Sequence, residues 1–262
     1  MKYKNIIVEN KNKICKITLN RPEKGNTLNL DLAKELFEAV NTLAAEDNCK
    51  SLILTGKGKL FCGGGDLKFL LSNKETVKKT LLEMTHYFHG AISRMVSMSA
   101  PVIVAINGTA GGGGFSLAIT GDIIYAVRGA KFTLAYTNAG LSPDGSSTYF
   151  LPRLVGLKLA KELMLTNRVF SAQEALEMGI IDKVIDNQES LIEEAEKMAA
   201  RFSDGPMEAY SSVKNLLSHT FTNGLETQME LESHFISTNA QSPNGIEGMQ
   251  AFKDKRKPKF NE

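Results

Sequence analysis

The chain has few cysteines and no long apolar run, and each absence excludes a class of protein. Its cysteines, Cys15, Cys49 and Cys62, are odd in number and widely spaced, which is typical of a reducing cytoplasm and not of a disulfide framework. Its apolar stretches fall far short of the roughly 20 residues of a membrane-spanning helix. Residues 1–10 lack the apolar segment of a secretory signal. We therefore expect a cytoplasmic protein that has no membrane partner.

The chain also lacks an excess of charge of either sign. Its 262 residues carry a formal net charge of +2, with 42% hydrophobic and 23% charged residues, as in a folded domain and unlike a disordered chain. A nucleic-acid-binding protein would present a strongly basic surface with interleaved aromatic side chains. The chain has instead a single short basic run, the tail 252–260, so nucleic acid is not expected to be the main partner.

Apolar periodicity indicates alternating strands and helices in the first two thirds of the chain. Alternation over residues 15–19 predicts a half-buried strand. The apolar residues of 102–106 and 123–127 predict strands, the first of them in a sheet covered on both faces. Helical spacing of apolar residues predicts helices over 31–46 and 76–97. This order of elements predicts an α/β fold.

The last third of the sequence changes to helical segments alone. Helices are expected over 189–202, 206–220 and 225–240, separated by turn residues. Long linkers rich in serine and glycine are absent from the chain. We therefore predict an α/β core over residues 1–200, followed by a C-terminal helical subdomain over 201–262.

Two glycine clusters each follow a predicted strand and precede a helical segment. The first is Gly63, Gly64 and Gly65, and the second is the run 111–114. Glycine permits close approach of the backbone to a ligand, and the first N–H groups of a helix have no partner within it. Two such clusters facing one another would direct two peptide N–H groups at one oxygen, which is what an oxyanion hole requires. Each cluster alone would equally suit a tight turn, and neither has the spacing of a nucleotide-binding motif.

Several motifs, in the same order along the chain, resemble the crotonase superfamily, the enoyl-CoA hydratase/isomerase family. They are the segments 20–28, 61–67, 101–122, 140–156, and 247–252 together with 255–258. The resemblance implies repeated ββα units wound into a spiral, with a C-terminal helical region that mediates trimerisation. It also implies an acyl-CoA thioester substrate and a homotrimer or a dimer of trimers. Coenzyme A would be part of the substrate, so neither a separate cofactor nor a metal is expected.

The resemblance also implies the thioester site. The backbone N–H groups of Gly65 and Gly113 match the oxyanion-hole positions of the family. Two fixed donors would stabilise negative charge on the thioester oxygen and make an enolate accessible. The residues expected to contact the substrate or its CoA part are Lys24, Cys62, Gly63, Gly64, Asp66, Leu67, Phe252 and Lys255. The last two match positions that often reach the CoA of a neighbouring subunit, although the basic tail would also suit a purely solvated end.

The acid–base groups near the acyl chain decide the reaction. Hydratases of the family use two glutamates, and the matching positions here are Ser116 and Tyr136. Serine is not a carboxylate base, and a tyrosine with an ordinary pKa of about 10 is a poor base at neutral pH. Asp144 lies where several isomerase-type members carry a catalytic acid, although Ser-Pro-Asp-Gly alone would also suit a turn.

We therefore predict a double-bond isomerase of the Δ3/Δ2-enoyl-CoA type, or a related ring isomerase, in which Asp144 carries a proton between two carbons. Three alternatives stay open. The first is a hydratase with an unidentified base. The second is hydrolysis like that of 4-chlorobenzoyl-CoA dehalogenase, with Asp144 as nucleophile and His89 activating water, although the assisting tryptophan of that enzyme is Tyr136 here and the chain has no tryptophan. The third is a family member that only binds acyl-CoA or RNA.

Overall fold

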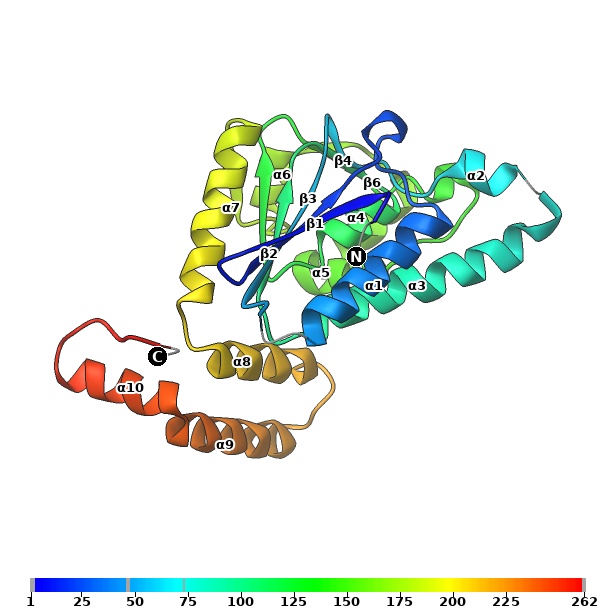
Figure 1. Ribbon diagram of the computed structural model, residues 1–262. Helices are drawn as coiled ribbons and strands as arrows, with labels where there is room; N and C mark the ends of the chain where they lie inside the picture. Colours follow the sequence, from blue (N-terminus) through cyan, green and yellow to red (C-terminus); the bar gives the residue numbers. More distant parts are fainter. Residues whose placement is uncertain (1–2, 46–47, 73, 261–262) are drawn as a thin grey trace.

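Two sheets form the centre of the fold within the residues that the computed structural model describes, which are 3–45, 48–72 and 74–260. The larger sheet has the strand order β1-β2-β3-β5-β7-β10 and the smaller has the order β4-β6-β8-β9 (Figure 1). The strands are β1 (Ile6–Lys11), β2 (Ile14–Leu19), β3 (Ser51–Gly56), β4 (Leu60–Cys62), β5 (Val102–Ile106), β6 (Thr109–Gly111), β7 (Ile123–Val127), β8 (Lys131–Thr133), β9 (Phe170–Ser171) and β10 (Lys183–Ile185).

Successive pairs of strands are divided between the two sheets. In each of the pairs β3–β4, β5–β6 and β7–β8, the first strand joins the large sheet and the second joins the small one. From β2 to β10 the large sheet is parallel, and only β1 is added to it in antiparallel orientation. A helix follows each pair, so the chain repeats a ββα unit. The predicted α/β class is therefore confirmed.

The helices surround these sheets and extend beyond them at one end (Figure 1). They are α1 (Leu30–Ala45), α2 (Leu67–Leu71), α3 (Val77–Ser97), α4 (Gly113–Ala118), α5 (Ser147–Thr166), α6 (Ala172–Glu177), α7 (Gln188–Ser203), α8 (Met207–His219), α9 (Leu225–Gln241) and α10 (Pro243–Lys253). Short 3₁₀ turns are η1 (Pro22–Lys24), η2 (Lys74–Thr76) and η3 (Thr137–Ala139). The helix expected over 31–46 is α1, and Glu46 lies outside the described residues.

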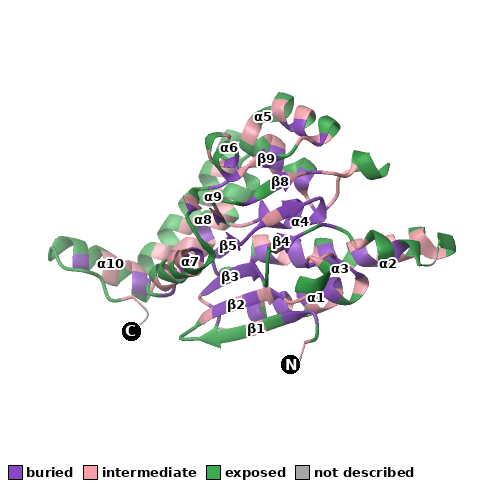
Figure 2. Cartoon of the chain, turned by 90° about the horizontal axis from the view of Figure 1, so that it is seen from above, coloured by how far each residue is buried: buried purple, intermediate pink, exposed green. Residues whose placement is uncertain are grey.

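The central strands of the large sheet are buried on both faces, as the run 102–106 predicts. Every residue of β3 and β5 is buried (Figure 2). Leu52 and Val104 belong to the main core, which α1 and α3 also enter, whereas Ile53 and Ile103 pack with Leu191 of α7. Because successive side chains of a strand point to opposite faces, helices on both sides are needed to bury such a strand. This packing confirms the prediction of a doubly covered sheet.

The C-terminal helices α8, α9 and α10 lie beside the sheet layers (Figure 1). Helix α7 ends at Ser203, so the expected boundary near residue 200 falls within α7, which packs on the sheet. Lys214 of α8 connects this region to the core, because its Nζ lies 2.7 Å from Asp122 Oδ2 and donates to the Ala100 carbonyl. Residues 1–2 and 261–262, the outer ends of the two expected ranges, lie outside the described residues. In the described part of the chain, each helix is too short or too polar to cross a bilayer.

Candidate active site

A cavity of about 280 Å³ brings both glycine clusters together with the loop that precedes α5. Its wall is mainly apolar. The residues that line it are Leu28, Ala33, Gly63, Gly64, Gly65, Leu67, Leu70, Leu81, Met84, Thr85, Phe88, Gly112, Gly113, Leu134, Ala135, Tyr136, Ala139, Leu141, Ser142 and Asp144. An apolar cavity with a few convergent polar groups is the usual form of a small-molecule site.

A bridge between two distant segments orients the Gly65 peptide so that its N–H points into no hydrogen bond within the described part of the chain. Leu28 pairs with Gly65 in a parallel β-bridge, in which the Leu28 N–H donates to the Gly64 carbonyl at 2.7 Å and the Asp66 N–H donates to the Leu28 carbonyl at 2.8 Å. In a trans peptide the C=O and the following N–H point in opposite directions. The Gly65 N–H therefore points away from Leu28, and it has no acceptor among the described residues.

The Gly113 N–H is free for a different reason. Gly113 is the first residue of α4, and the Gly112 carbonyl accepts the Ser116 N–H at 3.0 Å along the helix. The Gly113 N–H belongs to the same peptide as this carbonyl and points in the opposite direction. It therefore points outward from the start of the helix, where N–H groups have no intrahelical partner. Because Gly65 and Gly113 both line the cavity, each contributes an unpaired donor of the kind that an oxyanion hole needs.

The two clusters approach one another so closely that side chains are excluded between them. Gly64 has φ +99°, and a Cβ there would lie 2.8 Å from the Gly111 carbonyl oxygen. A Cβ on Gly114 would lie 2.2 Å from the carbonyl oxygen of Cys62. Only glycine allows both the positive φ and this backbone contact. The packing of the two segments against each other thus requires glycine at these positions. The same packing places both N–H donors at one cavity.

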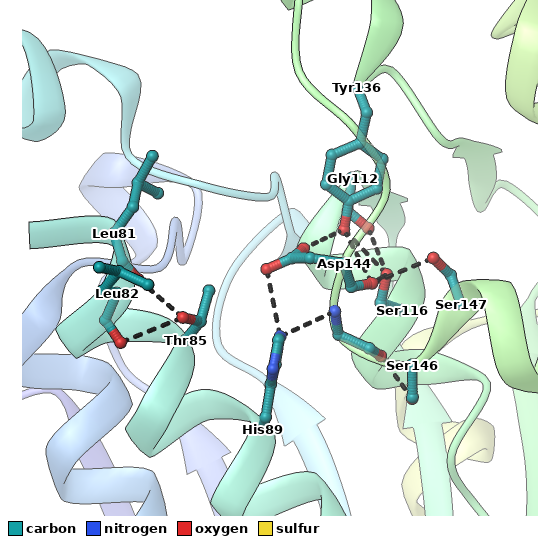
Figure 3. Close-up of polar contacts among 11 residues, drawn as sticks. Leu81, Leu82, Thr85, His89, Gly112, Ser116, Tyr136, Asp144, Ser146 and Ser147 are labelled. Atoms are coloured by element: carbon teal, nitrogen blue, oxygen red, sulfur yellow. Dashed lines mark hydrogen bonds and ion pairs between the residues drawn. The ribbon is translucent and has the colours of Figure 1, made fainter. Parts of the chain in front are cut away.

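Asp144 is the one carboxylate that lines the cavity among the residues that the structure describes. Tyr136 donates its hydroxyl to Asp144 Oδ1 at 2.6 Å, and Ser116 Oγ lies 2.9 Å from the same hydroxyl (Figure 3). Ser116 Oγ also donates to the Asp144 carbonyl at 2.8 Å. Burial, and secondly the neighbouring Asp144 carboxylate, raise the pKa of Tyr136 well above its usual value. The phenol therefore stays protonated at neutral pH and fixes one oxygen of Asp144.

His89 contacts the other oxygen of this carboxylate. Its Nε2 lies 3.4 Å from Asp144 Oδ2, and the Gly145 N–H donates to the same nitrogen at 3.1 Å (Figure 3). His89 comes from α3, 55 positions before Asp144 in the sequence, and only the fold brings the two together. The structure thus brings Ser116, Tyr136, His89 and Asp144 together in one group of polar contacts.

The other expected contact residues differ in their distance from the cavity. Gly63, Gly64 and Leu67 line it, whereas Cys62 and Asp66 are not among the described residues of its wall. The Cys62 side chain is fully buried, and this burial raises its pKa to about 12, so the thiol is unreactive at neutral pH. Asp66 caps α2 and pairs with Arg21 at 3.1 Å. Burial opposes ionisation of Asp66, but the Phe69 N–H and Arg21 together outweigh it and hold the pKa of Asp66 below its usual value.

Three expected CoA contacts lie outside the cavity wall within one chain. Lys24 ends the exposed turn η1. Phe252 is 87% exposed near the end of α10, and Lys255 follows that helix. None of the three is among the described lining residues of the cavity. Within the described part of the chain, no cluster of three or more His, Cys, Asp or Glu side chains is arranged to hold a metal ion.

Sequence reasoning missed two residues that shape the site. Leu28 orients the Gly65 peptide, as described above. Asn26 is buried at φ +54°, accepts the Arg21 N–H, and donates to the Lys57 and Leu60 carbonyls. It thereby fixes the turn that leads into Leu28. Both lie in the segment 20–28 that resembles the family, but the local sequence does not show these roles, because Asn26 and Leu28 each bond to segments more than 30 positions away.

Known proteins share this fold and much of this sequence. The enoyl-CoA hydratase/isomerase family model matches residues 9–262. The chain is 34% identical over 253 residues to 1,2-epoxyphenylacetyl-CoA isomerase from Escherichia coli strain K12, covering 94% of each protein. It is 30% identical over 254 residues to 4-chlorobenzoyl coenzyme A dehalogenase-2 from an Arthrobacter species, covering 95% of this chain and 91% of that protein.

A solved structure extends the likeness to three dimensions. An enoyl-CoA hydratase from Polaromonas sp. JS666 matches with a TM-score of 0.92 at 31% identity, covering 97% of this chain and 98% of that one. The match confirms the crotonase-like architecture that the ββα repetition indicates. The names of these relatives include an isomerase, a dehalogenase and a hydratase, so they agree on the acyl-CoA family and differ on the reaction. The chain belongs to the enoyl-CoA hydratase/isomerase family.

Proposed function

We propose that the protein is an enoyl-CoA isomerase of the Δ3/Δ2 type, with Asp144 as its proton shuttle. One observation carries the proposal. Among the described residues, Asp144 is the single carboxylate of a cavity that also holds the free N–H groups of Gly65 and Gly113. A single carboxylate beside an oxyanion hole suits a reaction in which one group both removes and returns a proton.

The chemistry follows from these positions. With the thioester oxygen at the two N–H groups, Asp144 takes a proton from C2 of a 3-enoyl chain. The electrons of that C–H bond form a dienolate whose negative charge rests on the thioester oxygen, where the two donors stabilise it. Asp144 then returns the proton to C4, and the double bond moves from C3 to C2. Because Tyr136 donates to Oδ1, Oδ2 is the oxygen available for both transfers.

Hydration is less well supported by the site. Water addition needs a base to activate water and an acid to protonate the α-carbon. The two positions that would hold glutamates in a hydratase are Ser116 and Tyr136, and their hydroxyl groups hydrogen-bond to one another and to Asp144. The pKa of Tyr136 is raised by burial, so its phenolate is not available at neutral pH. A hydratase would therefore require a base other than the side chains at these two positions.

Parallel assays of two substrates test the proposal. We expect 3-enoyl-CoA to be converted to the conjugated 2-enoyl-CoA, and 2-enoyl-CoA to be hydrated at least ~100-fold more slowly, because a positioned acid or base contributes about 10²–10⁴-fold to such a step. Product analysis by liquid chromatography and mass spectrometry separates the isomer from the hydrated product, which is heavier by one water. Efficient hydration together with absent isomerisation would contradict the proposal.

A second candidate function is hydrolytic dehalogenation of an aryl-CoA. The observation that favours it is the contact of 3.4 Å between His89 Nε2 and Asp144 Oδ2, since a carboxylate nucleophile and a neighbouring base are what such a reaction needs. A relative named as a 4-chlorobenzoyl coenzyme A dehalogenase adds support. However, Tyr136 already donates to the carboxylate, which weakens it as a nucleophile. Chloride release from 4-chlorobenzoyl-CoA, measured beside the two enoyl substrates, distinguishes this candidate, and we expect none above the enzyme-free rate.

We also propose that the protein works as a homotrimer or a dimer of trimers. No described residue of α9 is buried, and its Leu225, Met229 and Ile236 are exposed apolar side chains. A helix of 17 residues with an uncovered apolar face is typical of an interface. Light scattering on eluted protein should give three or six times 28.6 kDa, and Ile236→Glu should lower this mass. A wild-type protein that elutes as a monomer at micromolar concentration would contradict the proposal.

A further inference from the structure

His89 makes two contacts at the site, and together they define the state of its ring. The Gly145 N–H donates to His89 Nε2 at 3.1 Å, and Asp144 Oδ2 lies 3.4 Å from the same nitrogen. A nitrogen that accepts an N–H carries a lone pair there, so this hydrogen bond assigns the ring proton to Nδ1. The His89 side chain is 48% exposed, and within the described part of the chain its Nδ1 has no hydrogen-bond partner.

This arrangement changes when Asp144 holds a proton. In the resting site a carboxylate oxygen and a lone pair face one another, and no hydrogen bond joins them. Once Oδ2 has taken a proton from the substrate, it becomes a donor and competes with the Gly145 N–H for the lone pair of Nε2, 3.4 Å away. The Nδ1–H at the far side of the ring is then the group that can pass a proton to water. An imidazole that can accept at one nitrogen and release at the other is a proton carrier.

We propose that His89 exchanges the proton held by Asp144 with solvent during the lifetime of the dienolate. The inference rests on the proposed isomerase function and deepens it. The Gly145 N–H releases the lone pair of Nε2, and Oδ2–H gives its proton to it, which leaves a carboxylate and an imidazolium; Nδ1–H is then lost to water. The reverse steps return a solvent proton to Oδ2 before C4 is protonated. His89 acts through Asp144 and is not itself a catalytic residue.

The other neighbours of Asp144 do not offer such a route. Tyr136 and Ser116 form the second set of contacts, but Ser116 is fully buried and its hydroxyl bonds to Tyr136 and to the Asp144 backbone. Tyr136 donates its single hydroxyl proton to Oδ1 in a hydrogen bond, and the raised pKa of this phenol opposes loss of that proton. Among these side chains, the exposed ring of His89 is therefore the one that can carry the proton from the carboxyl group to water. The Asp144 side chain is itself 34% exposed, so direct exchange with water competes with this route, and His89→Gln measures the share that passes through the ring.

Isomerisation in D₂O measures this exchange directly. Each product molecule carries hydrogen at C4 when the abstracted proton is returned unexchanged, and deuterium when exchange comes first. We expect wild-type product to contain deuterium at C4 at low conversion. In His89→Gln, the amide oxygen can still accept the Gly145 N–H, but the side chain cannot carry a proton. The ratio of deuterium to hydrogen at C4 should therefore fall about tenfold or more, because transfers that lose a positioned acid or base slow by roughly 10²-fold or more.

His86→Gln is the matched control. It makes the same substitution one turn earlier on α3, where the ring packs against Phe37 and Tyr87 and does not contact Asp144. Its C4 label should equal that of the wild type. The labelling ratio is a property of each product molecule, so it does not depend on how much of a variant folds. It reports the competition between exchange at Asp144 and protonation of C4.

Two outcomes would overturn the role of His89. One is an unchanged C4 label in His89→Gln. The other outcome needs no variant. Wild-type enzyme is given 3-enoyl-CoA that is deuterated at both C2 positions, in H₂O. Retention of all of the transferred deuterium at C4 would overturn the role of His89. Both outcomes require that isomerisation occurs, so they leave the proposed function intact. Absence of isomerisation by the wild type would instead reject the proposed function.

Discussion

Asp144→Asn should lower kcat for isomerisation of 3-enoyl-CoA by about 10²–10⁴-fold, the usual contribution of a positioned acid–base group. Asparagine has nearly the same shape, and its amide oxygen can still accept the Tyr136 hydroxyl that now donates to Oδ1. What the variant loses is the group that accepts the C2 proton. Steady-state rates with saturating substrate measure the effect, because a loss confined to the chemical step appears in kcat.

The comparison variant for this experiment is Tyr136→Phe. It removes the 2.6 Å hydrogen bond to Asp144 but leaves the carboxylate in place, so its loss of kcat should be much smaller than that of Asp144→Asn. Calorimetric titration with a saturated acyl-CoA, which cannot react, reports whether each variant still binds. Asp144→Asn that retains kcat within tenfold of the wild type would contradict the shuttle and would favour a different base.

Gly113→Pro should lower kcat by about 10²–10³-fold, as expected for loss of one oxyanion-hole donor. Proline has no N–H, and the first position of a helix is where it is best tolerated, because that N–H has no intrahelical partner. Gly113 occupies this position in α4. The substitution therefore removes the proposed donor at a helix position that tolerates proline. It also constrains Gly112, whose φ +49° and ψ −125° lie outside the range usual before proline.

Gly113→Ala is the matched control, since it adds a Cβ and keeps the N–H. That Cβ would lie 2.9 Å from Leu28 Cδ1, the end of a flexible side chain, so alanine should bring only a modest loss of rate. Thermal unfolding followed by circular dichroism checks that both variants are folded. Equal rates for the proline and alanine variants would contradict a role of this N–H in the reaction.

Much of the secondary structure could be predicted, because it depends on local patterns of apolar residues. The strands expected at 102–106 and 123–127 are β5 and β7 at the same residues, and α3 differs from its expected range by one residue. Helix α5 was not predicted. It contains Pro152, and Gly156 within it has φ +78° and ψ +157°, so the chain bends and no single apolar face runs along its length. Tertiary packing, not periodicity, maintains this helix.

The site could be predicted only in part. The glycine clusters are visible in the sequence, because close backbone contacts such as that of Gly114 with Cys62 admit no side chain. The direction of each N–H is not visible, since it depends on the bridge from Leu28 to Gly65 and on the carbonyl of Gly112, the residue that precedes α4. Likewise, Cys62 directly precedes the first glycine cluster and is expected from the sequence to contact the substrate. In the fold its side chain is buried, and it is not among the described residues that line the cavity.

The sequence by itself determined the α/β class, the family resemblance, and the absence of glutamates at positions 116 and 136. These depend on residue identity and on spacing within short segments, which are local properties. Only the tertiary structure decided that Ser116 and Tyr136 bind the Asp144 loop, and that His89 faces the free oxygen of that carboxylate. Such contacts join segments up to 55 positions apart, and side-chain orientation across that distance is fixed only when the strands and helices have packed together.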